Sequence, residues 1–262
     1  MNVALVFTVS IISGLYTSCW GVFKDSPYEG FKIMTFLRSI FLHIVIFFTL
    51  YSISCLRPRF MALRTSQIFF LIMGIERLSS EIYKGFFRNE DQSKYLIPSR
   101  ITFLGKYITS NGLLYSVGVI LVAGTLALLF LDVKIEGFIE FCIVSNCTGL
   151  AGAFGGAYKD APFEGFKPLG FLRTPVVLLL TSPLFYFMGP VSLGFLIYMN
   201  LGLERFIVEY YKTYIQRTMS GKFRSDLQRS KKHIEVREKY HYIALFIILG
   251  VIVLIIRDIQ YI

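Results

Sequence analysis

Long apolar runs recur along the whole chain, and short polar segments separate them. Runs of roughly 17 to 25 apolar residues can cross about 30 Å of hydrocarbon as α-helices. They do not alternate between apolar and polar positions, as the strands of a membrane barrel would. We therefore predict an all-α integral membrane protein with about eight transmembrane helices. The predicted spans are 3–23, 36–55, 60–75, 113–131, 137–158, 169–187, 191–203 with an extension toward 211, and 240–256.

Two polar motifs each occur twice between these apolar runs. The first, K-D-x-P-[YF]-E-G-F-K-x-x-x-F-L-R-[ST], covers residues 24–39 and 159–174. The second, G-[IL]-E-R-x-x-x-E-x-Y-K, covers residues 74–84 and 202–212. Because both motifs recur in the same order, the pattern indicates an internal duplication. It predicts two tandem four-helix membrane repeats, residues 1–134 and 135–262.

An even number of spans in each repeat predicts that equivalent segments run in the same direction through the membrane, as in a parallel repeat. Both motif copies then share one face with 22 of the 27 lysines and arginines. The positive-inside rule places that face, with the 213–239 segment, in the cytoplasm or an equivalent compartment, and both termini opposite. The other face keeps five basic residues, Arg57, Arg59, Arg64, Lys134 and Arg257.

Composition supports the membrane assignment and bears on possible partners. The chain is 55% hydrophobic and 16% aromatic, with a mean hydropathy of +0.60, which is high for a soluble domain. The net charge of +10 fits basic loops on one face of a multi-span protein, so we predict membrane lipids and not nucleic acid as partners. The four cysteines lie in or beside apolar runs without a C-x-x-C spacing, which is typical of packing residues.

Small and polar residues within the spans predict helix packing. Gly14-x-x-x-Ser18 and Gly149-x-x-Gly152-x-x-Gly155-Gly156 each place small side chains along one helix, which is typical of close contact between spans. Asn146 and Asn200 are polar within apolar runs, and we expect them to bridge to neighbouring helices, with contact to a permeant molecule as the alternative.

The first motif contains a local start signal for a helix. Pro27 suits the first position of a helix, and Ser26 with Glu29 has the spacing of a capping box. The pattern predicts a turn into a short interfacial helix. In the second copy Ala161 replaces the serine, so Asp160 becomes the expected cap. Capping therefore does not explain why the copies share their charged residues.

The shared charged residues pose a pairing problem inside the membrane. Arg38 and Arg173 enter the second span of their repeats, where an unpaired guanidinium costs at least ~2.5 kcal/mol. Glu76 and Glu204 end the third span. We predict the pairs Arg38–Glu76 and Arg173–Glu204, each closing one repeat on itself. Further along each third span, we expect local ion ladders of Arg77, Glu81 and Lys84, and of Arg205, Glu209 and Lys212.

The same charges form a candidate ligand site, because their surplus of arginine and lysine suits a phosphate, a carboxylate or a lipid head group. The alternative is that they only clamp the spans together. The sequence predicts no metal site from histidine or cysteine spacing and leaves catalytic residues and cofactors undetermined; for a membrane enzyme, the candidates to bind Mg²⁺ or act as a base are Asp25, Asp160, Glu29 and Glu164. The candidate ligand-binding residues are Lys24, Asp25, Glu29, Arg38, Glu76, Arg77, Glu81, Lys159, Asp160, Glu164, Arg173, Glu204, Arg205 and Glu209.

The longest polar segment, residues 213–239, has eight basic residues between positions 217 and 239 and three acidic ones. Such a segment beside a membrane attracts anionic lipid by about 1 kcal/mol for each basic side chain near the surface. An ordinary positive-inside anchor has the same composition.

Three functions are compatible with this sequence. We favour a transporter or channel for a small or anionic ligand, because duplicated parallel bundles with a polar site between the repeats are common among transporters. The first alternative is a membrane enzyme that acts on a lipid-linked phosphate. The second is a non-catalytic subunit of a membrane complex, and assembly into an oligomer or complex is compatible with all three.

Overall fold

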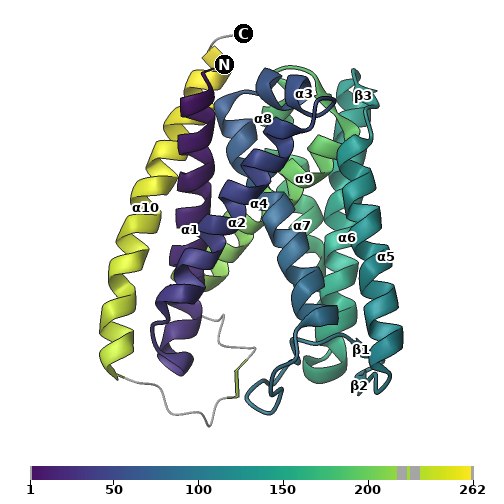
Figure 1. The fold of residues 1–262 in the computed structure, drawn as a ribbon, viewed down its shortest axis with the longest axis vertical. Coiled ribbons are helices and arrows are strands. Elements are labelled where there is room, and N and C mark those ends of the chain that lie inside the picture. Colours follow the sequence, from purple (N-terminus) through teal and green to yellow (C-terminus); the bar gives the residue numbers. More distant parts are fainter. Residues whose placement is uncertain (1, 217–222, 225–230, 261–262) are drawn as a thin grey trace.

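The structure is a computed structural model that describes residues 2–216, 223–224 and 231–260 (Figure 1). Each of the eight predicted apolar segments contains helix, but the predicted segment 60–75 is divided between α3 and α4, and residues 191–192 form a strand. The helices are α1 (Val3–Glu29), α2 (Ile33–Ser52), α3 (Arg57–Ala62), α4 (Thr65–Ile82), α5 (Asn111–Phe130), α6 (Phe138–Glu164), α7 (Pro168–Thr181), α8 (Pro183–Tyr186), α9 (Leu193–Glu204) and α10 (Lys231–Gln260). Three π-helical turns extend α4 and α9: η1 (Tyr83–Phe87), η2 (Arg205–Glu209) and η3 (Tyr211–Ile215). Short antiparallel pairs join β1 (Thr102–Phe103) to β2 (Lys106–Tyr107), and β3 (Lys134–Ile135) to β4 (Val191–Ser192).

Six helical segments in the described part of the chain are long and apolar enough to cross a membrane. They are α1, α2, α5, α6, the segment Pro168–Tyr186 that joins α7 to α8, and Arg237–Gln260 of α10. The two inner helices are not among the six: α9 has only 12 residues, and α4 carries Gln67, Glu76 and Arg77. The chain is therefore an all-α, multi-pass membrane protein.

The outer helices present large apolar side chains on their outer faces. For example, the exposed fraction is 64% at Phe41 of α2, 69% at Ile120 of α5, 74% at Leu180 of α7 and 79% at Phe246 of α10. A water-soluble protein rarely exposes apolar surface this extensively. These faces suit contact with lipid hydrocarbon.

Helices α4 and α9 lie against each other at the centre of the bundle. Every residue of α4 from Thr65 to Glu76 is buried, as expected for a helix that is apolar on most sides. The two backbones touch where Gly74 meets Gly202. A Cβ atom on Gly74 would lie 1.8 Å from the carbonyl oxygen of Tyr198, and one on Gly202 would lie 2.0 Å from that of Phe70. Only glycine permits this approach.

The predicted small-residue contacts are confirmed at Gly14 and Gly149 but not at Gly155 and Gly156, where nothing lies within 4 Å of an added Cβ atom. Gly14 of α1 packs on Ile40 of α2, and Gly149 of α6 packs on Pro175 of α7; an added Cβ atom would lie 2.8 Å and 2.6 Å from their Cα atoms. The predicted bridge is confirmed at Asn200, whose amide nitrogen is 3.1 Å from a side-chain oxygen of α6, but not at Asn146, which has no side-chain hydrogen bond among the described residues.

Both copies of the first motif lie at the same end of the bundle. Helix α1 begins and α10 ends at the same end of the bundle as α3 and β3, whereas the β1–β2 hairpin marks the opposite end (Figure 1). Helix α6 ends at this hairpin, because a Cβ atom on Gly105 would lie 2.9 Å from Pro162. Glu29, the last residue of α1, and Lys159, near the end of α6, line one pocket there. The end opposite the termini therefore holds the shared charges.

The predicted turn at the prolines is wrong. Helix α1 continues through Pro27, and α6 continues through Pro162. The helices end instead at Gly30 (φ 75°) and Gly165 (φ 78°), whose N–H groups each donate to a carbonyl four residues earlier at 2.9 Å. Proline has a helical φ, so it is tolerated near a helix end, and a glycine with positive φ is a stronger stop signal.

Candidate functional site

Two ion pairs join α4 to the helix formed by α9 and η2. They lie just beyond the point where Gly74 meets Gly202, which we call the glycine crossing. Glu76 accepts from Arg205, and Arg77 donates to Glu204. The side chains of Glu76, Arg205 and Glu204 are less than a tenth exposed, and that of Arg77 is about a quarter exposed. Each motif copy thus supplies one acid and one base to the other copy. Buried pairs of this kind fix the register between two helices.

The pairing predicted from the sequence is wrong. The sequence predicts that Arg38 binds Glu76 and that Arg173 binds Glu204, but both carboxylates are bound by arginines of the opposite motif copy. The glycine crossing explains the difference, because it brings the two Glu-Arg dipeptides directly together. Among the described residues, neither Arg38 nor Arg173 has a hydrogen-bond or ion-pair partner.

Each buried carboxylate also accepts from a hydroxyl group. Ser80 donates to Glu76 at 2.6 Å, and Thr174 of α7 donates to Glu204 at 3.1 Å. Arg77 donates further to the carbonyl of Leu201 at 2.9 Å. These contacts offset the cost of burying the charges. They also anchor α7 to α9 at Thr174.

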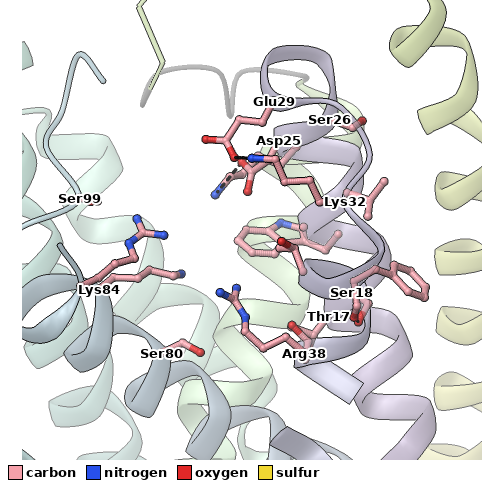
Figure 2. Close-up of a pocket in the computed structure, with 18 of the residues that line it drawn as sticks. Thr17, Ser18, Asp25, Ser26, Glu29, Lys32, Arg38, Ser80, Lys84 and Ser99 are labelled. Atoms are coloured by element: carbon pink, nitrogen blue, oxygen red, sulfur yellow. Dashed lines mark hydrogen bonds and ion pairs between the residues drawn. The ribbon is translucent and has the colours of Figure 1, made fainter. Parts of the chain in front are cut away.

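A pocket of about 300 Å³ opens beside the Glu76–Arg205 pair (Figure 2). Its walls come from α1, α2, α4, η1, η2, α6 and the segment 88–99. The formal charge of its lining is +4, which makes it a cationic cavity. The basic residues are Lys24, Lys32, Arg38, Lys84, Arg88, Lys94, Lys159 and Arg205, and the acidic residues are Asp25, Glu29, Glu76 and Glu90.

Arg38 of α2 and Lys84 of η1 point into this pocket from opposite sides (Figure 2). Lys84 also donates to Glu81 at 3.2 Å, so part of its charge is balanced. Arg38 has no such acceptor in the described part of the chain. Its five N–H donors are therefore available to a ligand.

Trp20 forms an aromatic wall of the pocket. The Lys24 ammonium is 4.7 Å and the Arg205 guanidinium 4.9 Å from the centre of its ring, and the indole N–H donates to Thr213 at 2.8 Å. Cations at these distances are attracted by the face of the ring. Trp20 therefore helps to hold two of the pocket's positive charges in place.

An ion-pair network ties the end of α1 to the segment 88–99. Glu29 binds both Lys32, at 3.1 Å, and Lys94. Partial burial disfavours the charged form of Lys94, but the bonds to Glu29 and Tyr95 together outweigh it and raise the pKa of Lys94 above its usual value. The rim of the pocket is thus held by paired charges.

The second motif copy places its residues in several environments. Lys159 lines the pocket and lies 3.9 Å from Glu81. Glu164 is bound to Lys167 at 2.6 Å near the surface. Half-buried Asp160 and Glu209 lie near Lys212; the Glu209 carboxylate is 4.0 Å from its ammonium.

The structure thus divides the predicted ligand residues into three groups. Lys24, Asp25, Glu29, Arg38, Glu76, Lys159 and Arg205 meet in the pocket. Arg77 and Glu204 form the second buried pair beside it. The remaining residues, Glu81, Asp160, Glu164, Arg173 and Glu209, are not part of its lining.

Sequence reasoning missed several residues that line the pocket. Lys32 and Lys84 had a usable signal, because they recur as Lys167 and Lys212 in the second copy. Trp20 had a weaker one, as the single tryptophan of the chain. Arg88 and Lys94 follow the repeated motifs and carried no signal.

The predicted lipid-binding segment 213–239 lies largely outside the described residues. Within it, the ring of Phe223 stacks on Tyr28 at 4.4 Å, and the N–H of Arg224 donates to the carbonyl of Lys94 at 3.1 Å. Phe223 also lines the pocket. The role of this segment toward lipid stays a prediction.

Among the described residues, no three His, Cys, Asp or Glu side chains lie in a group that could hold a metal ion. No protein-family profile, curated protein or solved structure matches the chain. A function must therefore be inferred from the geometry of the pocket.

Proposed function

We propose that the chain is a membrane carrier that binds a small anion in the cationic pocket. The observation that supports this most directly is Arg38, which points into a cavity of formal charge +4 and has no partner among the described residues. A guanidinium binds a phosphate or carboxylate through two parallel N–H donors. An anion of this class would supply the missing partner.

The position of the pocket supports a carrier. Lys24 from the first motif copy and Lys159 and Arg205 from the second line the same cavity. Many carriers bind their substrate between two repeats that move relative to each other. We propose two parallel four-helix repeats, residues 1–134 and 135–262, with α4 and α9 as inner spans and the pocket on the cytoplasmic side.

The π-helical turns η2 and η3 are a further argument for function at this site. Regular α-helix gives way to η2 at Arg205, which pairs with Glu76 and lines the pocket. Departures of this kind from α-helical geometry are frequent at functional sites.

A membrane enzyme acting on a lipid-linked phosphate is the second candidate. Asp25 favours it, because one of its carboxylate oxygens is buried without a hydrogen bond and lies 3.4 Å from the Lys24 ammonium. Beside a bound phosphate, this carboxylate is placed to accept a proton. The carrier is preferred because arginine and lysine dominate the lining.

The test uses the purified full chain with labelled orthophosphate and labelled succinate as probes. Binding is measured by equilibrium dialysis, and uptake is measured in sealed proteoliposomes. We expect Arg38→Gln to weaken binding by about tenfold to a hundredfold, because hydrogen bonds to charged groups contribute about 1.5 to 3 kcal/mol. Arg57→Gln is the matched control: Arg57 is exposed on α3, at the end of the bundle away from the pocket.

Uptake that Arg38→Gln abolishes and Arg57→Gln preserves supports the carrier. Conversion of a phosphorylated lipid without uptake supports the enzyme instead. Equal binding by the wild type and Arg38→Gln, or no binding of either probe, contradicts the proposal and favours a structural subunit.

A further inference from the structure

Four acidic side chains line the cationic pocket, and three of them accept hydrogen bonds. Glu29, Glu76 and Glu90 are each bound by lysine, arginine or serine side chains. The carboxylate of Asp25 accepts no hydrogen bond from any residue that the structure describes. It is therefore the acidic group of the lining that is open to a hydrogen-bond donor on a ligand.

Asp25 lies beside a cation that attracts an anion into the pocket. Its Oδ1 atom is buried and lies 3.4 Å from the ammonium of Lys24, whose side chain is less than a tenth exposed. The ring of Trp20, 4.7 Å from the same ammonium, helps to hold this cation in place. The Asp25 side chain is 40% exposed, so part of it faces open space on the α1 side of the pocket (Figure 2). An anion that binds Lys24 must therefore lie next to the carboxylate of Asp25.

This neighbour distinguishes between anions by their protons. The two oxygens of a carboxylate offer about four lone-pair positions, and the ion-pair contact with Lys24 leaves most of them vacant. Sulfate, a deprotonated carboxylate and a phosphodiester present only acceptor oxygens, so Asp25 repels them. A phosphate that keeps a proton presents a P–O–H group, which donates a charge-assisted hydrogen bond to a carboxylate. Its other oxygens still accept from Lys24 and Arg38.

We infer that Asp25 makes the pocket selective for a phosphate group that keeps a proton, from a free ion or from a phosphomonoester lipid head group. The inference rests on the proposed anion pocket, and it narrows the ligand from phosphates and carboxylates in general to protonated phosphate. The cations of the lining supply the affinity. Asp25 determines the specificity, because it rejects an anion that has no O–H group.

The experiment compares orthophosphate with sulfate, which has the same tetrahedral shape but no proton to donate. Equilibrium dialysis of the purified full-length chain at about pH 6 uses each labelled anion in turn. Orthophosphate then carries mainly one negative charge and sulfate carries two, so attraction to a lining of formal charge +4 would by itself favour sulfate. We expect orthophosphate to bind at least about tenfold more tightly, because only orthophosphate donates to Asp25.

Two variants test the role of Asp25. Asp25→Asn replaces one acceptor oxygen by an amide group that donates to sulfate, and Asp25→Ala removes the acceptor without adding a donor. We expect the ratio of phosphate to sulfate affinity to fall to about one or below in both variants. Asp132→Asn is the matched control: Asp132 binds Arg59 of α3, at the end of the bundle away from the pocket, and this variant should keep the wild-type ratio. Partial loss of folded protein lowers the number of sites for both anions alike and leaves the ratio unchanged.

The source of the phosphate is assigned by competition. Displacement of orthophosphate by dihexanoyl phosphatidic acid identifies a lipid head group as a ligand, and failure to displace identifies the free ion. A wild type that binds both anions equally or prefers sulfate overturns the inference, as does a ratio that both Asp25 variants retain. Binding of succinate without orthophosphate also overturns it and leaves the anion pocket standing. Binding of none of the three anions overturns the proposed function itself.

Discussion

Glu76 and Arg205 form a buried ion pair although 129 residues separate them in sequence. The first belongs to α4 and the second to η2, so the pair connects the two motif copies. Arg77 and Glu204 form the reverse pair, with the arginine on α4 and the glutamate on α9. The two copies are therefore clamped to each other, and not each to itself.

This exchange predicts a specific rescue. Glu76→Gln leaves the guanidinium of Arg205 buried without its carboxylate, and we expect a loss of about 3 to 5 kcal/mol in the free energy of unfolding. The double variant Glu76→Arg/Arg205→Glu restores an ion pair of reversed direction and should recover part of that loss. Denaturant titration of the purified protein, followed by circular dichroism, measures both.

The control for this prediction is the pair that the sequence suggested. Glu76→Arg/Arg38→Glu exchanges charges between residues that are not paired in the structure. It should remain as unstable as Glu76→Arg alone. Recovery of stability by this variant, with none from the Arg205 exchange, would show that the ion pairs close within each repeat.

The glycine crossing predicts a strong effect of adding one methyl group. Gly74→Ala and Gly202→Ala each place a Cβ atom within about 2 Å of a backbone carbonyl oxygen on the facing helix. The helices must separate, and we expect each variant to lose at least about 1 to 3 kcal/mol of stability. Gly124→Ala on α5 is the matched control, since nothing lies within 4 Å of the added atom. Thermal midpoints in one detergent compare the three; equal midpoints would contradict a backbone contact at the crossing.

Helix positions followed directly from the sequence because apolar runs of membrane-spanning length leave the chain few alternatives. Helix ends did not follow, since Pro27 and Gly30 offer competing signals three residues apart. The capping pattern favoured a start at Pro27, but the structure uses the positive φ of Gly30 as a stop. Local signals of about 1 kcal/mol cannot outweigh the tertiary packing of a long apolar helix.

The membership of the charged site was predictable in part, since Arg88 and Lys94 were missed, and its pairing was not predictable. The repeated motifs pointed to Arg38 and Glu76 because a charged residue in an apolar segment is costly to bury and therefore marks a pairing or binding site. Which residues touch depends on the approach of α4 to α9, and that approach is set by Gly74 and Gly202 in a contact between distant segments. Periodicity along one helix carries no information on such a contact.

Trp20 provides an internal reporter of anion binding. It is the single tryptophan of the chain, and the cations of Lys24 and Arg205 each lie within 5 Å of its ring centre in the pocket lining. An anion that draws these cations toward itself changes the field at the indole ring. We therefore expect orthophosphate to shift or quench the tryptophan emission in a saturable way. Emission that stays constant at phosphate concentrations saturating in dialysis would place the bound anion away from Trp20.

Lys94 gives a prediction on pH. Its raised pKa means that the bond to Glu29 contributes its full stabilisation below the unfolded pKa of about 10.4 and is lost only as the pH rises through the higher folded pKa. Lys94 should therefore stay charged from pH 6 to pH 9. Sulfate keeps a constant charge over this range, so it is the probe. Sulfate binding is measured at pH 6 and at pH 9. We expect Lys94→Gln to weaken it by about twofold to tenfold, and by the same factor at the two pH values. A factor that falls toward one at pH 9 would mean that Lys94 has lost its proton there.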